Sequence, residues 1–298
     1  MQYFSDEKIY MNTRVAISGY SEFGTVETLE LVQKAYKKFD HVVKRFSRFD
    51  NSSDLSKLNN SYKKISLDPE FAFLIKTALD ISKISNWKFD PTIIDVLEAY
   101  GYSEKKDIKD KNEVLQKIES MKSTRPKVSD IEFDGKAIKL APGQRLDFGS
   151  IGKGYAVDLA AKVLSPIKNF VINAGGDVYA SGKNIEKNTK WNVGLSADSE
   201  TFFGKIELQN QSLASSGSGQ IKFKNFHHLI NSKALIPETE TDQVFTLADS
   251  GILADGYATM LFLTGEDGLS ILEKKNIGGM IIRKNKILTN KYFPNFLN

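Results

Sequence analysis

The sequence contains no cysteine among its 298 residues. This absence excludes disulfide bonds, thiolate metal sites, a cysteine nucleophile and a lipid anchor on a cysteine of this chain. No run approaches the ~20 consecutive apolar residues of a membrane-spanning helix, and the N-terminal MQYFSDEK lacks the basic and apolar regions of a signal peptide. We therefore expect a soluble, cytoplasmic protein with no membrane insertion, or the mature form of an exported protein.

The sequence also has little excess charge of either sign. Its 41 Lys and Arg residues nearly balance 37 Asp and Glu residues, which leaves a formal net charge of +4. The basic residues are spread along the chain, so no nucleic-acid partner is expected. With 41% hydrophobic and 26% charged residues, the composition is typical of a globular protein of one large or two ordinary domains.

Histidines are few, with three in the chain. His41 lies on the apolar face of a predicted helix, where a lone histidine is more often structural or at the surface than a ligand. His227 and His228 are adjacent, and in a strand their side chains point to opposite faces. Because no third nitrogen or sulfur ligand accompanies them, we do not expect a zinc site.

Hydrophobic periodicity predicts the elements of the first half of the chain. We expect a strand over 8–18, helices over 26–46 and 68–84, a short helix after Ser52 or Ser53, and a hairpin over 131–140 that turns at Asp134-Gly135. Asp68 as N-cap and Pro69 at the first helical position mark the start of the second long helix. The Lys-rich, polar stretch at about 103–129 is interpreted as a surface insertion.

The second half of the chain alternates short strands with glycine-rich turns. We expect strands on both sides of Gly175-Gly176 within 169–182, strands at 191–195 and 202–208, a loop of small residues at 213–219, an apolar helix within 247–263 and a hairpin over 277–290. The Gly-Gly pair indicates close approach of the backbone to another group.

The stretch LDFGSIGKGYAVD, residues 146–158, predicts a strand end, a glycine-bearing turn and the start of a helix. A helix N-terminus presents free N–H groups and the positive end of its dipole, which suits a phosphate, and Lys153 adds a cation. Asp147 and Asp158 suit ribose hydroxyls, a metal ion or helix capping. The spacing matches neither a Walker A loop nor a GxGxxG motif, so a turn with solvated charges explains this stretch equally well by itself.

Two other places carry residues suited to a ligand. Phe49 in a polar loop, and Phe89 beside Asp90, can stack on a flat heterocycle or simply pack the protein. Asp255 and Thr259 are four residues apart, which puts a carboxylate and a hydroxyl on one helical face. These hard oxygen ligands suit Mg²⁺, although a helix cap plus a threonine bonded back to its own helix explains them equally.

Seven motifs occur in an order that resembles the FAD:protein FMN transferase family, the ApbE-like proteins: FSRFDNSSDLSKLN, FDPT, LDFGSIGKGYAVD, NAGGDVYASG, SSGSG, HHLIN and ADGYAT. Each motif is modest alone, but the ordered series is specific and extends over about residues 9–283. The resemblance implies a single α+β domain over residues 1–298, related to the tunnelling (T-) fold, with FAD held in a cleft.

The resemblance also implies a reaction. With Mg²⁺ near the pyrophosphate, the FMN half of FAD would be transferred to a Thr or Ser hydroxyl of an acceptor flavoprotein, and AMP would leave. The acceptor would carry a Ser/Thr-Gly-Ala-Ser/Thr-type motif, of which this chain has no obvious copy. Two alternatives stay open: an FAD pyrophosphatase that yields FMN and AMP, and a non-catalytic FAD-binding protein.

Carried over position by position, the resemblance assigns the site residues. Those for FAD are Met11 and Phe49 at the flavin end, Lys88, Phe89, Asp90, Asp147, Lys153 by the phosphates, and His228. Those for the metal are Ser150 through its backbone carbonyl, Asp255 and Thr259. The proton of the acceptor hydroxyl would go to His228 or to Asp255 through the metal shell, and the sequence does not choose between them.

The sequence departs from the family pattern in three places, at four positions in all. Asn12 replaces the glycine of a frequent Met-Gly-Thr, and Asn231-Ser232 replace a carboxylate and a proline after the histidine motif. The second departure puts in doubt an acid–base role at that carboxylate. Phe49 stands where Tyr or Trp is common, so stacking is retained and a hydroxyl or indole contact is lost.

Overall fold

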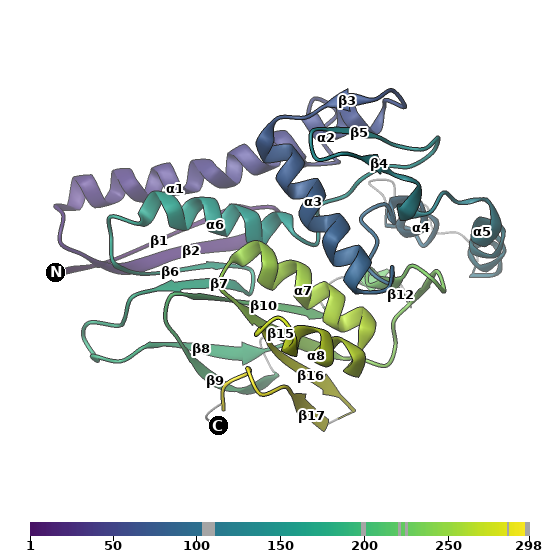
Figure 1. The fold of residues 1–298 in the computed structure, drawn as a ribbon. Helices are drawn as coiled ribbons and strands as arrows, with labels where there is room; N and C mark the ends of the chain where they lie inside the picture. The colour runs from purple at the N-terminus through teal and green to yellow at the C-terminus, as the bar shows by residue number, and fades with distance from the viewer. Residues whose placement is uncertain (103–110, 198–200, 220–221, 224–225, 285, 296–298) are drawn as a thin grey trace.

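The computed structural model describes residues 1–102, 111–197, 201–219, 222–223, 226–284 and 286–295. Its main element is an eight-stranded antiparallel sheet (Figure 1). In spatial order its strands are β1 (Gln2–Tyr10), β2 (Thr13–Ser21), β6 (Asn169–Ala174), β7 (Asp177–Ser181), β10 (Gln211–Gly217), β15 (Gln243–Ala248), β16 (Gly278–Arg283) and β17 (Lys286–Thr289). This is a mixed helix-and-sheet domain, as expected.

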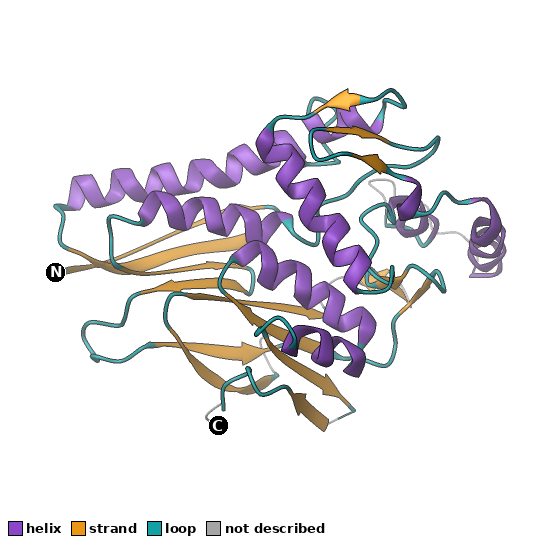
Figure 2. Ribbon diagram, viewed as in Figure 1, coloured by secondary structure: helices purple, strands orange, loops and turns teal. Residues whose placement is uncertain are grey.

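The two faces of the sheet are covered differently. Figure 2 shows the helices gathered on one face, where α1 (Thr25–Phe46), α6 (Gly152–Leu164) and α7 (Gly251–Thr264) lie over the strands. On the other face lies the hairpin of β8 (Trp191–Ser196) and β9 (Phe202–Leu208). Each interface has its own hydrophobic core, because side chains alternate between the faces of a strand. On β15, for example, Val244 belongs to the helix-side core and Phe245 to the hairpin-side core.

The predicted helix starts are confirmed. Helix α3 (Pro69–Ile84) begins after Asp68, whose carboxylate accepts hydrogen bonds from the N–H groups of Glu70 and Phe71 at 3.0 and 3.1 Å. Helix α2 (Asp54–Asn59) is capped by Ser53, whose hydroxyl accepts from the Ser56 N–H at 3.0 Å. Such caps satisfy N–H groups that have no partner within the helix.

Two sequence predictions are wrong. The stretch 8–18 is not one strand, because the chain reverses between β1 and β2 at Met11 and Asn12, with φ of 50° and 57°. The small residues at 213–219 do not form a loop, because most of them belong to β10, which pairs with β7 and β15 in the sheet. Helix α7 packs on β10, and short side chains on that strand leave room for the helix.

The polar stretch 103–129 is only partly a surface segment, and residues 103–110 lie outside the described residues. It contains α5 (Lys111–Thr124) and a 3-10 turn, η1 (Val128–Asp130). On α5, Val114 and Ile118 are buried in a small third core, together with residues of α4 (Ile94–Ala99) and Ile230. Apolar side chains therefore anchor helix α5. The sequence did not indicate this, because lysines and other polar residues dominate the stretch.

The remaining elements are short. They are β3 (Ile65–Ser66), β4 (Glu132–Phe133), β5 (Ala137–Lys139), β11 (Lys222–Phe223), β12 (Phe226–His227), β13 (Ile230–Asn231), β14 (Ile236–Pro237) and α8 (Glu266–Glu273). The predicted hairpins over 131–140 and 277–290 are confirmed as β4–β5 and β16–β17. Within the described ranges, every helix is too short or too polar to cross a membrane.

Candidate active site

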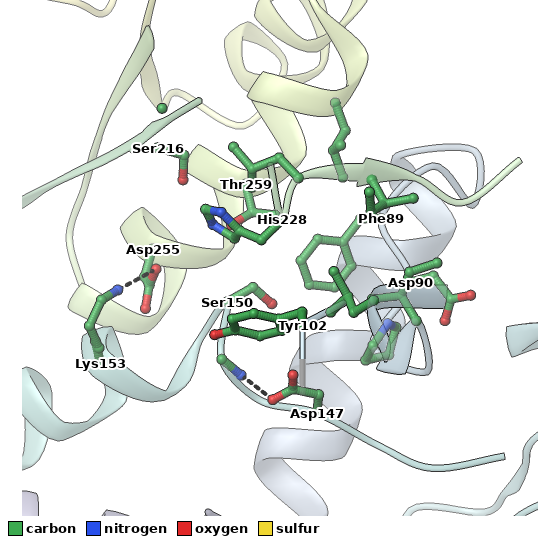
Figure 3. A pocket seen from close by; sticks show the side chains of 18 of the residues that line it. Phe89, Asp90, Tyr102, Asp147, Ser150, Lys153, Ser216, His228, Asp255 and Thr259 are labelled. Atoms are coloured by element: carbon green, nitrogen blue, oxygen red, sulfur yellow. Dashed lines mark hydrogen bonds and ion pairs between the residues drawn. The ribbon is translucent and has the colours of Figure 1, made fainter. Parts of the chain in front are cut away.

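A pocket lies between α7, the turn that leads into α6, and the loop around residues 89–93 (Figure 3). Eight of the predicted site residues line it: Phe89, Asp90, Asp147, Ser150, Lys153, His228, Asp255 and Thr259. Three other predicted site residues do not line the pocket in the part of the chain that the structure describes: Met11, Phe49 and Lys88. Lys88 lines a neighbouring pocket with Glu238 and Glu266. The roles assigned to these residues by resemblance stay predictions.

Helices α6 and α7 cross in close contact at one side of the pocket. A Cβ on Gly154 would lie 2.1 Å from the Gly251 carbonyl oxygen and 2.8 Å from the Asp255 Cβ, so only glycine fits there. The Gly154 N–H donates to Asp255 Oδ2 at 3.0 Å. The side chain that faces the pocket from α7 is therefore fixed against the first turn of α6.

Asp158 holds the same crossing from the other helix. Its carboxylate accepts hydrogen bonds from the N–H groups of Gly251 and Ile252 at 2.5 and 2.9 Å. The sequence left three roles open for Asp158, and in the structure Asp158 caps a helix. The helix that it caps is α7. Burial raises the pKa of Asp158 to about 6, although both N–H donors act in the opposite direction.

Lys153 lies between two buried carboxylates. Its Nζ is 2.6 Å from Asp177 Oδ2 and 3.4 Å from Asp255 Oδ1. Burial alone would lower the pKa of Lys153, but these two carboxylates outweigh it and hold that pKa above its usual value. Burial, and next the charge of Asp255, raise the pKa of Asp177 to about 7. The sequence signal that could have identified Asp177 is its place directly after Gly175-Gly176.

Asp147 is held by the residues around it. Its Oδ1 accepts from the Gly149 N–H at 2.8 Å, and its Oδ2 is 3.1 Å from the Nε of Arg48. The Arg48 guanidinium lies 4.1 Å from the ring centre of Phe49 and 5.2 Å from that of Tyr102. Tyr102, which the sequence did not single out, lines the pocket, and its ring lies near Asp147 and Ser150 in Figure 3. Phe49 is 51% exposed and packs on Arg48.

The wall formed by residues 88–92 is tied to a distant segment through Arg125. The Arg125 guanidinium donates to Asp90 Oδ2 at 2.8 Å, to Asp95 at 2.9 and 3.0 Å, and to the Thr92 carbonyl at 2.6 Å. The Asp147 N–H also donates to the Pro91 carbonyl at 2.7 Å. This wall is therefore preorganised by hydrogen bonds that use nearly all the donors of one arginine.

The two adjacent histidines face different surroundings, as expected. His228 lines the pocket, whereas His227 Nε2 lies 2.7 Å from the Glu238 carbonyl oxygen and its ring packs edge-on against Phe262. Among the described residues no group of three His, Cys, Asp or Glu side chains could hold a metal ion. A divalent cation in this pocket would therefore need backbone, hydroxyl or substrate oxygens beside a carboxylate.

The donors around Asp255 have that chemistry. Asp255 is 3% exposed, and Thr259 lies one turn further along α7 on the same face. Ser150 lines the same pocket at the end of the turn that precedes α6. A carboxylate, a hydroxyl and a backbone carbonyl are hard oxygen donors, so these residues fit Mg²⁺ when substrate phosphates complete the coordination.

The chain matches the family model described as the ApbE family over residues 11–281. A protein of Haemophilus influenzae named FAD:protein FMN transferase is 28% identical over 272 residues, which cover 84% of this chain and 78% of the relative. A protein of Chlamydia muridarum with the same name is 28% identical over 280 residues, which cover 87% and 86% of the two chains.

Two solved structures have the same fold. The flavin transferase ApbE from Vibrio cholerae matches with a TM-score of 0.87 at 19% identity, over 99% of both chains. The ApbE protein from Thermotoga maritima matches with a TM-score of 0.86 at 23% identity, over 97% of both chains. The arrangement of sheet and helices described above is thus shared along nearly the whole chain.

Proposed function

The chain belongs to the ApbE family, and from this membership together with the pocket we propose that it is a Mg²⁺-dependent FAD:protein FMN transferase. In the proposed reaction a Thr or Ser hydroxyl oxygen of an acceptor flavoprotein attacks the FMN-side phosphorus of FAD. The bond to the AMP-side phosphate breaks, and AMP leaves. The observation that carries the proposal is that Ser150, Lys153, His228, Asp255 and Thr259 line one pocket.

Charge neutralisation is the first task of such a site, because phosphoryl transfer depends mainly on positioning and electrostatics. We assign the metal to Asp255, Thr259 and the Ser150 carbonyl. When bound, the cation neutralises charge on the pyrophosphate. The ammonium of Lys153, in the first turn of α6, presents positive charge to the same pocket.

Removal of the hydroxyl proton is the second task, and the geometry favours His228 over Asp255. Both Asp255 oxygens already accept, Oδ2 from the Gly154 N–H at 3.0 Å and Oδ1 from Lys153 at 3.4 Å. His228 lies on the opposite side of the pocket from Asp147, with its ring near Thr259 (Figure 3). We therefore assign His228 as the base that takes the proton of the acceptor hydroxyl.

Binding of the flat rings of FAD is the third task. Phe89 is 2% exposed and lines the pocket together with Tyr102. Aromatic faces of this kind can stack on a heterocycle. Asp147, held in place by Arg48, supplies an acceptor for polar groups of the nucleotide. Both oxygens of Asp90 are bonded to Thr92 and Arg125, so Asp90 shapes the wall of the pocket.

The decisive experiment incubates the protein with FAD and Mg²⁺, with and without a protein that carries a Ser/Thr-Gly-Ala-Ser/Thr motif. The acceptor should gain the mass of FMN less one water, and AMP should appear in equal amount. Free FMN and AMP without acceptor would instead identify an FAD pyrophosphatase. FAD that stays intact with several acceptors would identify a binding protein and would overturn the proposal.

A further inference from the structure

Asp177 is a buried carboxylate that the proposed reaction does not use. It is 2% exposed and stands at the start of β7, directly after the turn at Gly175 and Gly176. Asp177 is not among the lining residues of the pocket, but its carboxylate contacts a neighbour that is. That neighbour is Lys153, whose Nζ lies 2.6 Å from Asp177 Oδ2.

Lys153 is shared unequally between its two partners. The ammonium is 0.8 Å closer to Asp177 than to Asp255, from the difference between 3.4 and 2.6 Å. Asp255 is the one side-chain carboxylate in the assigned metal set. An ammonium in full contact with that carboxylate would compete with a divalent cation for the same oxygen, because both interactions are electrostatic and both need the Oδ1 lone pairs.

We propose that Asp177 is a positioning residue that holds most of the contact with the Lys153 ammonium, so that the ion pair of Lys153 with Asp255 stays long and a divalent cation can displace it. This inference rests on the proposed function for the identity of the metal carboxylate. Asp177 then has two effects in the assembled site. It holds the Lys153 ammonium at the edge of the pocket, and it keeps the competing ion pair between Lys153 and Asp255 at the longer distance of 3.4 Å.

A simpler explanation must be separated from this one. Removal of any nearby negative charge weakens the binding of a cation through the electrostatic field alone. That effect would be the same whether Lys153 is present or absent. Competition by Lys153, in contrast, disappears when Lys153 is removed. A double-mutant cycle between Asp177→Asn and Lys153→Met therefore distinguishes the two explanations.

The experiment measures Mn²⁺ binding by electron paramagnetic resonance at about pH 8, without flavin or acceptor. When Lys153 is present, we expect Asp177→Asn to raise the Kd for Mn²⁺ about tenfold, which corresponds to about 1.4 kcal/mol. In the Lys153→Met background the same substitution should change binding by less than about twofold. Asp249→Asn, which removes an exposed carboxylate next to α7, is the charge control and should have little effect.

A second readout addresses the fold and the geometry. Circular dichroism and urea unfolding establish that each variant is folded, and a metal-free crystal structure of Asp177→Asn should show the Lys153 Nζ closer to Asp255 Oδ1 than the present 3.4 Å. Equal weakening in both backgrounds, or no Mn²⁺ binding by the wild-type protein, would overturn the inference. If the double-mutant cycle gives the expected Mn²⁺ affinities but the protein does not transfer FMN, the result would count against the proposed function, since Mn²⁺ binding is measured without transfer.

Discussion

Asp158 and Asp255 each bind the N-terminal turn of the helix that carries the other. Asp158 on α6 accepts from the N–H groups of Gly251 and Ile252 at the start of α7, and Asp255 on α7 accepts from the Gly154 N–H in the first turn of α6. The two carboxylates also complement the positive ends of the two helix dipoles. The proposed metal carboxylate is therefore fixed relative to the first turn of α6, which carries Lys153.

Substitution of Gly154 should separate the two helices. In Gly154→Ala the new Cβ would meet the Gly251 carbonyl at 2.1 Å, so we expect a loss of about 2–3 kcal/mol in the free energy of unfolding. Gly152→Ala is the matched control, because no atom lies within 4 Å of its Cβ position. Urea unfolding measures both variants. Similar unfolding free energies for both would show that the close crossing is not required.

Asp255→Asn should abolish metal-dependent transfer while the fold is retained. The amide keeps an acceptor for the Gly154 N–H but has lost the charge that holds a cation, so we expect the transfer rate to fall at least about 100-fold. Asp249→Asn removes an exposed carboxylate six residues earlier and should leave the rate unchanged. AMP release and acceptor mass measure the reaction. Transfer by Asp255→Asn at the wild-type rate would refute the metal assignment.

His228→Asn should lower kcat by about 10²–10⁴, the usual contribution of a general base. The dependence of kcat on pH should also lose its acidic limb, because no imidazole remains to be protonated. Fluorescence titration of FAD gives the binding constant separately. A raised Kd for FAD with unchanged kcat would mean that His228 contacts the nucleotide and that another group takes the proton.

Arg125→Lys should weaken FAD binding by loosening the wall at residues 88–92. Lysine keeps the charge but cannot donate to Asp90, Asp95 and Thr92 at once. We expect KM for FAD to rise about tenfold with kcat nearly retained. Arg145→Lys, which alters a half-exposed pair with Glu98 on α4, is the control. Equal kinetics in the two variants would show that Arg125 does not position this wall.

The raised pKa of Asp158 should make stability depend on pH. Since the folded pKa of about 6 exceeds the model-compound value of 3.8, the folded state holds this proton more tightly than the unfolded state. The stabilisation of the folded state by this proton is therefore fully present below about pH 4 and is lost as the pH rises through about 6. We compare the change in the free energy of unfolding between about pH 4 and pH 7.5 in the two proteins. This change should differ by on the order of 2 kcal/mol between the wild type and Asp158→Asn.

Urea unfolding at the two pH values, with a chelator present, tests this expectation. Asp80→Asn, which removes an exposed carboxylate on α3 paired with Lys76, should leave the pH dependence as in the wild type. An unchanged pH dependence in Asp158→Asn would indicate that Asp158 titrates alike in the folded and unfolded states. The pKa of Asp177, raised to about 7, contributes in the same direction and remains in both variants.

Local signals account for what the sequence predicted well. Asp68 and Pro69 determine the start of α3 through their own backbone and side chains, so neighbouring residues suffice to read it. Strand β15 was missed because all its residues are buried and no alternation of polar and apolar positions marks it. Strand β10 was misread because small residues that accommodate a helix are also typical of loops.

Long-range partners account for what the sequence could not predict in the site. Arg125 is one basic residue in a Lys-rich stretch, and its partners Asp90 and Asp95 stand 35 and 30 residues earlier. Asp177 is recognisable only once β7 and the start of α6 are adjacent in space. The motif residues Asp147, Ser150 and Lys153 could be predicted because they lie within a few positions of one another and of the glycines that shape their turn.

The strand order of the main sheet has a consequence for how the protein folds. Every strand pairs with the next sheet strand along the chain, and in six of the seven pairs at most 29 residues separate the two strands. The exception is β2 with β6, which are separated by residues 22–168. Closing that loop costs only about 0.6 kcal/mol more for each doubling of its length. We therefore expect this closure to limit the folding rate while it takes little from the final stability.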